Sequence, residues 1–169
     1  MLRPMTEDDL VQVLAWRNDW AIRRFMLTQQ EIAFENHRNW FIGASKDKTR
    51  QLLIYEDADG PVGHMNFKID ASTGIADWGF YAAPGAARGT GRAMGHESLA
   101  FAFGTLGLHK VCGQVLDFNE PSRGMHLALG FVEEGVLRQQ ARVNDAYHDL
   151  FCYGILAGEW AGMEQDLKA

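Results

Sequence analysis

The spacing of apolar residues divides the chain into a helical first third and a strand-rich remainder. Near the start, Leu10, Val13 and Leu14 recur at helical spacing behind Thr6 and Asp9, which resemble a capping box. We therefore expect a helix here, a short strand before it and two helical pieces after it. The predicted bounds are Leu2–Pro4 for the strand and Thr6–Asn18, Trp20–Met26 and Phe34–Ala44 for the helices.

The central part of the chain has the period of two that is typical of strands, interrupted by turn residues. Clusters of Asp, Gly and Ser at 57–60 and 70–72 favour turns between neighbouring strands. A loop over Ala82–Ala87 then precedes a long helical stretch. The predicted strands are Gln51–Glu56, Pro61–Ile69, Thr73–Tyr81, Leu108–Leu116, one opened by Gly130 and Phe131, and two near Glu134–Arg142 and Tyr147–Leu156; the predicted helices are Gly89–Leu106 and Glu120–Leu129.

This order of elements predicts a fold of the mixed α/β (α+β) class with a central, mostly antiparallel sheet. Strands and helices do not alternate regularly, which argues against a doubly wound fold. A length of 169 residues suits one well-cored domain and is short for two. We therefore expect residues 1–169 to form a single domain.

Composition narrows the class of partner. Apolar residues make up 47% of the chain and the formal net charge is −6, which is typical of a globular protein and lacks the basic footprint of nucleic-acid binding. The first residues contain no apolar stretch of a secretory signal, and no run approaches the roughly 18 apolar residues of a membrane span. We therefore expect a cytoplasmic protein that binds neither nucleic acid nor membrane.

The few candidate metal ligands are not arranged as a site. The two cysteines, Cys112 and Cys152, lie in separate strand-like runs, and His109 near the first has no second cluster of ligands. The sequence therefore predicts no metal.

The end of the third central strand and the helix behind it hold the strongest chemical signal. The glycine-rich run Arg88–Ala93 follows a loop and opens the long helix. Amides at a helix start lack intrahelical acceptors, and the helix dipole adds partial positive charge there. Gly89 and Gly91 let a ligand approach the backbone, while Arg88 and Arg92 add formal charge. A pyrophosphate is the expected guest.

These glycines also loosely resemble the fingerprint of dinucleotide-binding folds, but their context differs. Gly89, Gly91 and Gly95 lie deep in the chain behind a long loop. No acidic residue stands at a strand end about 20 residues further on, where a ribose hydroxyl would need one. A dinucleotide site is therefore a minor alternative.

The run Arg88-Gly-Thr-Gly-Arg-Ala93 matches the Arg/Gln-x-x-Gly-x-Gly/Ala signature of the GCN5-related N-acetyltransferases, the GNAT superfamily. Asn119 after a strand, Ser122 behind it and Gly130-Phe131 after the next helix also resemble the second half of that family. The resemblance covers nearly the whole chain. It implies a GNAT fold, with a central mixed, mostly antiparallel sheet of about seven strands and about four flanking helices. It also implies acetyl-CoA as co-substrate and direct attack by an amine.

The resemblance places the donor in two regions. Backbone amides of the glycine-rich run would hold the CoA pyrophosphate, and a backbone N–H near Gly79–Tyr81 would polarise the thioester carbonyl as an oxyanion hole does. In the family, the thioester lies between two strands that splay apart. The implied cofactor-binding residues are Gly79, Phe80, Tyr81, Arg88, Gly89, Thr90, Gly91, Arg92, Ala93, Asn119 and Ser122.

The catalytic residues that follow from the resemblance are Tyr81, Asn119 and His126. The family's usual general acid is a Tyr seven residues after the Asn, and this sequence has His126 at that position, so an imidazole would protonate the leaving thiolate. The alternative is that His126 is only a polar residue of its helix. Further polar groups near the expected gap, none of which the sequence selects as a base, are Tyr81, His64, Asp77 and Glu97. Loss of the amine proton to water is an equal alternative.

A narrower resemblance concerns the acceptor. Trp16-Arg-Asn18, Trp78-Gly-Phe-Tyr81 and Glu134-Gly-Val-Leu-Arg138 resemble the branch that acetylates the 4-amino group of UDP-4-amino-4,6-dideoxy-N-acetyl-β-L-altrosamine in pseudaminic acid biosynthesis. A UDP-linked acceptor needs cations for its phosphates and an aromatic platform for its uracil. The substrate-binding residues that we expect are Arg17, Arg23, Arg24, His37, Phe67 and Trp78, with Phe25, Phe34, Arg38 and Trp40 as further candidates.

Several alternatives stay open. The same side chains could form a solvated helix face and an ordinary core, and core is the interpretation we favour for Trp16 and Trp40. The protein N-terminal acetyltransferase branch shares Asn119 and Ser122, and its acceptor would call for an acidic cleft. A non-catalytic CoA-binding module would bind acetyl-CoA without releasing CoA. Edge strands in the C-terminal half make a homodimer a further option.

Overall fold

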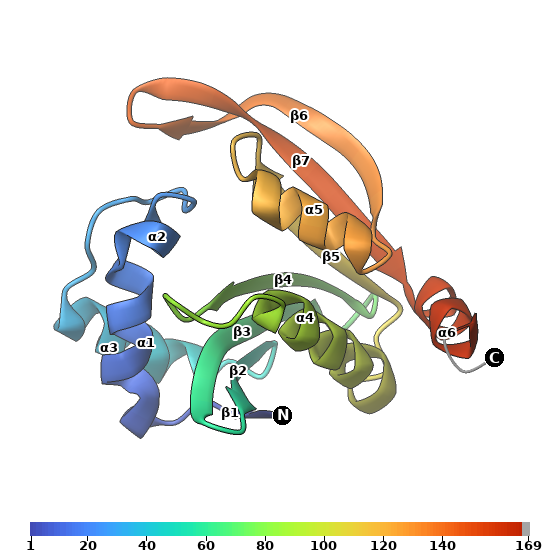
Figure 1. Cartoon of the computed structure of the whole chain (residues 1–169), viewed down its shortest axis with the longest axis horizontal. Helices are drawn as coiled ribbons and strands as arrows, with labels where there is room; N and C mark the ends of the chain where they lie inside the picture. Colours follow the sequence, from blue (N-terminus) through green and yellow to red (C-terminus); the bar gives the residue numbers. More distant parts are fainter. Residues whose placement is uncertain (167–169) are drawn as a thin grey trace.

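The fold is built around one seven-stranded sheet, and the computed structural model describes residues 1–166 (Figure 1). The strand order is β1-β2-β3-β4-β5-β7-β6, and each neighbouring pair is antiparallel except β4 and β5, which run parallel. The mixed, mostly antiparallel sheet that the sequence predicts is confirmed. In chain order the elements are β1 (Leu2–Pro4), the 3-10 helix η1 (Glu7–Asp9), α1 (Leu10–Asn18), α2 (Trp20–Arg23), α3 (Phe34–Ala44), β2 (Arg50–Asp57), β3 (Gly60–Asp70), β4 (Ile75–Ala82), α4 (Thr90–Ala100), the π-helix η2 (Phe101–Thr105), β5 (Lys110–Leu116), α5 (Glu120–Ala128), β6 (Val132–Val143), β7 (Ala146–Leu156) and α6 (Ala157–Asp166).

The helices differ from the prediction in number and bounds. Six α-helices are present in residues 1–166, where the sequence predicts about four. The first predicted helix begins as η1 and continues as α1, and the strand expected after Gly130 and the next candidate are one strand, β6. The sequence does not predict α6, because Trp160 and Met163 alone form too short an apolar pattern. No helix within these residues combines the length and apolar character needed to cross a bilayer.

The sheet carries helices on both faces (Figure 1). On one face, Leu10, Val13 and Phe41 of α1 and α3 pack against Leu52 and Ile54 of β2. The other face holds the main core, to which α4, η2, α5 and α6 contribute. Because side chains of a strand alternate between the two faces, β3 and β4 supply residues to both layers.

β6 forms one edge of the sheet and pairs only with β7. Its apolar side chains Val132, Val136 and Leu137 are exposed. An exposed edge of this kind can pair with a second chain, and the homodimer remains a prediction.

A buried ion pair fastens the start of the chain to the sheet. The Asp9 carboxylate accepts hydrogen bonds from the Arg3 guanidinium at 2.8 and 2.7 Å and from the Thr6 backbone N–H at 2.8 Å, so the capping box predicted from the sequence is present. Arg3 also donates to Glu56 of β2 at 2.7 Å. Burial alone would raise the pKa of Asp9, but the hydrogen bonds from Arg3 and Thr6 outweigh it and hold the pKa below its usual value.

We expect Asp9→Asn to lower the free energy of unfolding at pH 7 by about 2 kcal/mol, because the partly buried Arg3 guanidinium loses its carboxylate. A carboxyl whose folded pKa is depressed stabilises the protein above its unfolded pKa, and this stability is lost as the pH falls through the folded pKa. The difference between variant and wild type should therefore shrink in acid. Urea unfolding at pH 7 and pH 3 measures both effects. The exposed neighbour Asp8 gives the control variant Asp8→Asn; equal midpoints for the two variants at pH 7 would refute the prediction.

Candidate active site

β4 and β5 pair over only three residue pairs and then diverge. The ladder ends at Asp77↔Cys112, whereas β4 stays paired with β3 as far as Ala82 and β5 stays paired with β7 as far as Leu116. Each strand thus keeps its outer partner and loses its inner one. Alternate backbone N–H and C=O groups of both strands therefore face the gap without a partner from the sheet.

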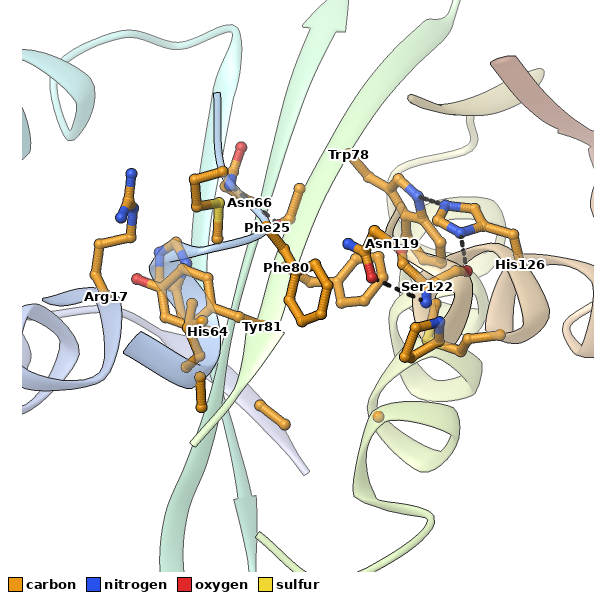
Figure 2. A pocket seen from close by; sticks show the side chains of 18 of the residues that line it. Arg17, Phe25, His64, Asn66, Trp78, Phe80, Tyr81, Asn119, Ser122 and His126 are labelled. Atoms are coloured by element: carbon orange, nitrogen blue, oxygen red, sulfur yellow. Dashed lines mark hydrogen bonds between the residues drawn. The ribbon is translucent and has the colours of Figure 1, made fainter. Parts of the chain in front are cut away.

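A pocket of about 1240 Å³ opens over this gap. Its walls come from α1, α2, α3, the strands β3, β4 and β5, the start of α4 and most of α5 (Figure 2). The predicted site residues that line it are Arg17, His37, Trp78, Gly79, Phe80, Tyr81, Arg88, Gly89, Gly91, Arg92, Asn119, Ser122 and His126. Figure 2 shows Phe80 between two groups of side chains, which are Arg17, His64 and Tyr81 on one side and Trp78, Asn119, Ser122 and His126 on the other.

The start of α4 forms an anion-binding end of the pocket. Gly89 is the N-cap, and its φ of 99° is a left-handed conformation that favours glycine. No side chain caps this helix and its first turn has no acidic residue. The Thr90 amide donates to the Ala87 carbonyl at 3.1 Å, so the Gly91 and Arg92 amides are the ones left for a ligand. Arg88, Gly91 and Arg92 line the pocket beside them. The geometry and charge of this end fit a pyrophosphate.

The start of α5 faces the same pocket. Asn119 caps α5, and its side-chain oxygen accepts a hydrogen bond from the Ser122 N–H at 3.3 Å. The carboxamide NH₂ group of Asn119 is thus the part that can donate to a ligand. α4 and α5 approach each other closely at Gly95, where a Cβ would lie 2.5 Å from the Leu129 Cδ1. This contact packs the middle of α4 against the residue that follows α5, and the starts of both helices line the pocket.

His126 has both ring nitrogens in hydrogen bonds. Nε2 lies 3.0 Å from the Trp78 Nε1 and Nδ1 lies 2.7 Å from the Ser122 carbonyl oxygen (Figure 2). An indole N–H can only donate, so Nε2 accepts and the imidazole proton is on Nδ1, which donates to Ser122. Burial lowers the pKa of His126, with the Ser122 hydrogen bond acting in the opposite direction. The acid role expected for His126 is at odds with this geometry, because a buried neutral imidazole has no free proton to give.

The Trp78–His126 pair lies where β4 and β5 part. A Cβ on Gly113 of β5 would clash with the His126 Nε2 and would lie 2.8 Å from the Trp78 Nε1. Trp78 stacks on Phe131 with ring centroids 4.8 Å apart, and His126 stacks on Tyr153 at 5.0 Å. Glycine at 113 therefore lets a tightly packed aromatic wedge lie directly against the strand.

Arg17 and Asn18 of α1 hold the loop that borders the other end of the pocket. Arg17 donates through Nη2 to the Thr28 carbonyl at 2.9 Å, and Asn18 exchanges hydrogen bonds of 2.9 and 2.8 Å with the backbone of Ile32. The Arg17 Nη1 is buried and has no partner among residues 1–166, although Arg17 lines the pocket. A buried guanidinium N–H without an acceptor costs free energy that a bound acceptor recovers.

The pocket wall carries cations and histidines but no carboxylate. Within the described part of the chain, its lining includes three arginines and three histidines and neither Asp nor Glu. Such a wall favours an anionic ligand and disfavours a polycation.

Three predicted substrate-binding residues lie elsewhere. Phe67 is 0% exposed within the main core, so that prediction is wrong. Arg23 is directed at its own loop, where it donates to the Gln29 carbonyl at 2.9 Å and pairs with Glu31 at 3.3 Å. Arg24 also lies outside the pocket wall. Neither cation contacts the cavity over the gap.

The wall also contains residues that the sequence analysis does not identify. Asn66 of β3 donates to the backbone of β4 at 3.0 Å, and Gln114 of β5 lines the gap. Both are polar residues inside apolar strand runs, which is the signal that marks them. Trp40, expected in the core, is 38% exposed and lines the pocket. Thr90 and Ala93 belong to the first turn of α4 but not to the wall.

The chain is similar in sequence and in fold to known acetyltransferases. The family model described as "Acetyltransferase (GNAT) domain" matches residues 1–132. The uncharacterized N-acetyltransferase YokL, from the SPbeta prophage of Bacillus subtilis (strain 168), is 28% identical over 162 residues, which cover 94% of this chain and 90% of that protein. A spermidine N-acetyltransferase from Vibrio cholerae, solved in complex with CoA and spermine, has a TM-score of 0.89 at 23% identity over 95% of this chain and 97% of that chain. At that identity, the structural likeness shows the fold alone.

We expect Gly113→Ala to lower the free energy of unfolding by about 1–3 kcal/mol, because the added methyl group overpacks the Trp78–His126 wedge. Gly104→Ala is the control, since a Cβ there meets nothing within 4 Å. Urea unfolding of both variants measures the effect. If the Gly113 variant were as stable as the Gly104 variant, the Trp78–His126 pair would not be packed tightly against β5.

Proposed function

Since the chain belongs to the family of acetyltransferases with a GNAT domain, it is an acetyl-CoA-dependent N-acetyltransferase, and we propose that its acceptor is the amine of a nucleotide-linked amino sugar. The specific acceptor in this proposal is UDP-4-amino-4,6-dideoxy-N-acetyl-β-L-altrosamine, acetylated on its 4-amino group in pseudaminic acid biosynthesis. The observation that carries the proposal is the buried, unpartnered Nη1 of Arg17 in a wall without carboxylates.

The donor occupies the α4 end and the gap in this proposal. The first amides of α4 and the Arg88 and Arg92 guanidinium groups bind the pyrophosphate of acetyl-CoA. The pantetheine arm lies along β4, whose inner edge has lost its β5 partner beyond Asp77. A backbone N–H within Gly79–Tyr81 polarises the thioester carbonyl, and the Asn119 NH₂ group donates to the donor from the β5 side.

The amine attacks the acetyl carbon directly, without a covalent enzyme intermediate. Burial raises the pKa of Tyr81 well above its usual range, with Arg17 opposing the shift, so the phenol stays protonated and can donate a hydrogen bond. His126 remains neutral and acts as a positioning residue for Trp78. The acid role first expected for it is not part of this proposal.

An anionic acceptor suits the opposite end of the pocket. A diphosphate oxygen would give the Arg17 Nη1 the acceptor it lacks, in a charge-assisted hydrogen bond. Trp40 lines the pocket with its ring centroid 6.2 Å from that of His64, and Phe25 also lines the pocket, so both offer aromatic surfaces to a nucleobase.

Cationic acceptors fit this wall less well. A polyamine carries several positive charges and would face Arg17 at the acceptor end without a carboxylate on the described wall to compensate them. A protein N-terminus of the kind that needs an acidic cleft meets the same obstacle. Both substrate classes are therefore comparison substrates in the experiments below.

We expect Gly91→Trp to raise the KM for acetyl-CoA at least about tenfold, because the indole fills the space where the pyrophosphate would lie. Gly91 lines the pocket, and a Cβ there makes only an ordinary contact of 3.8 Å with the Met125 Sδ, so the backbone tolerates a side chain. Gly43→Trp on α3 is the control, because a Cβ at Gly43 meets nothing within 4 Å and lies outside the pocket wall. Equal KM values in the two variants would show that the pyrophosphate does not bind at the start of α4.

We expect the enzyme to release CoA from acetyl-CoA with the UDP-4-amino sugar and not with spermidine or an N-terminal peptide. Arg17→Gln should raise the KM for the nucleotide sugar about 10–100-fold, which corresponds to a lost charged hydrogen bond. Arg38 of α3, a further candidate from the sequence, is exposed and lies outside the pocket wall, so the control variant Arg38→Gln should leave this KM unchanged. A continuous thiol-release assay measures both, and turnover confined to spermidine or peptide would show that the acceptor assignment is wrong.

A further inference from the structure

His64 is a buried imidazole that faces the pocket and has no hydrogen-bond partner. It is 2% exposed, and neither ring nitrogen has a partner among residues 1–166, although it lines the pocket. The ring stacks on Tyr81 with centroids 5.2 Å apart and meets the edge of Trp40 at 6.2 Å. A buried imidazole held by packing alone has no structural use for its nitrogens, which points to a ligand as their partner.

His64 lies next to the segment of β4 along which the thioester is proposed to bind. In the β3–β4 ladder it is opposite Tyr81, and Asn66 is opposite Gly79 on the same face. Gly79 and Tyr81 belong to the segment of β4 that has parted from β5. Figure 2 shows His64 and Tyr81 together on the Arg17 side of Phe80, which is the side proposed for the acceptor.

The pocket leaves few groups that can take a proton. Its lining includes no carboxylate in the described part of the chain, and two other polar candidates, Asp77 and Glu97, are not on the wall. His126 uses both nitrogens in hydrogen bonds. Of the remaining imidazoles, His37 on α3 also has a buried Nε2 without a partner among residues 1–166. His64 is on β3, directly opposite Tyr81 of the β4 segment that has parted from β5, and is therefore the imidazole placed nearer the gap.

We propose that His64 is the catalytic residue that accepts the proton of the acceptor's ammonium group, and that Tyr81 and Trp40 position its ring. The proposal rests on the N-acetyl transfer assigned to this pocket, and it holds for any amine that the enzyme acetylates there.

The step balances without a further reactant. The bound ammonium group gives one proton to a ring nitrogen of His64 and becomes a free amine. The amine nitrogen forms a bond to the acetyl carbon, the carbon–sulfur bond breaks, and the second proton of the nitrogen goes to the departing thiolate to give the CoA thiol. His64 then releases its proton to water as the products leave.

The surroundings of His64 keep its ring neutral, which is the form that can accept a proton. The pKa of His64 is lowered to about 4, chiefly by burial, with His37 on α3 acting in the same direction and Asp9 of η1 in the opposite one, so the ring is neutral at pH 6 and above. Tyr81 on β4 is an uncharged phenol in this range, and Arg17 on α1 is a cation that disfavours the ammonium form of a nearby amine. A bound diphosphate would raise the pKa of His64 and so ease the transfer.

The test is the pH dependence of His64→Asn with the UDP-4-amino sugar as acceptor. An amine with a pKa of about 8 is mostly protonated at pH 6.5 and mostly neutral at pH 9.5. Without its base, the enzyme must wait for the neutral amine, so kcat/KM should fall about 100-fold at pH 6.5 and less than about fivefold at pH 9.5. The affinity for acetyl-CoA, measured by calorimetry, should not change.

His109→Asn is the control, because His109 is exposed and lies outside the pocket wall. A His64→Asn enzyme with wild-type kcat/KM, or with the same loss at both pH values, would overturn the proposal, since a merely structural role has no such pH dependence. Added imidazole should partly restore His64→Ala at pH 6.5. Absence of rescue in a variant that still binds acetyl-CoA would count against the proposal.

The wild-type enzyme gives a measurement that does not depend on the folding of a variant. Its kcat/KM for the acceptor should vary little between pH 6 and pH 8, and a tenfold rise per pH unit would overturn the role of His64 as base. If the wild type releases CoA with spermidine or a peptide instead of the nucleotide sugar, the acceptor assignment fails. The His64 experiments then use that amine, so the two failures are distinguished.

Discussion

The parting of β4 and β5 after three residue pairs is the constraint on which the rest of the structure depends. Two neighbouring strands can separate only if each keeps a partner on its other side and if something fills the point of separation. β3 and β7 provide the partners, and the Trp78–His126 wedge fills the point of separation against Gly113. The pocket exists because backbone groups in the gap and helix starts beside it are left for a ligand.

The wedge and the acceptor end divide the polar chemistry of the pocket between them. On the wedge side, the imidazole of His126 is tied to Ser122 and Trp78 and is a structural element. On the acceptor side, Arg17 and His64 have polar atoms that nothing in the described chain satisfies. Buried groups are normally satisfied in folded proteins. Arg17 and His64, and also the Nε2 of His37, are on the pocket wall and are therefore the unsatisfied groups that a ligand can reach.

The sequence predicts well what depends on local periodicity and turn chemistry. Most of the strands, the helical stretch of α4 and η2, and the glycine-rich start of α4 follow from runs of a few residues, although two predicted strands after Gly130 form the single strand β6. Pocket residues are harder, because they depend on contacts between distant segments. His126 is disqualified as an acid by Trp78, which precedes it by 48 positions, and Phe67 lies on the core face of β3 although an aromatic residue there could equally have faced a ligand. For Trp40 the prediction is wrong in the opposite direction, because this residue is expected in the core and lines the pocket instead.

Arg17 shows a cost that the free protein carries for the sake of its ligand. One nitrogen secures the loop at Thr28 while the other is buried without an acceptor, so the empty protein is locally frustrated at this position. Only a bound ligand can give this nitrogen an acceptor, so ligand binding stabilises the folded protein against thermal unfolding. Any anion that fits the pocket should therefore raise the melting temperature. An apolar residue at position 17 would make the free protein more stable and weaken its binding of the anion.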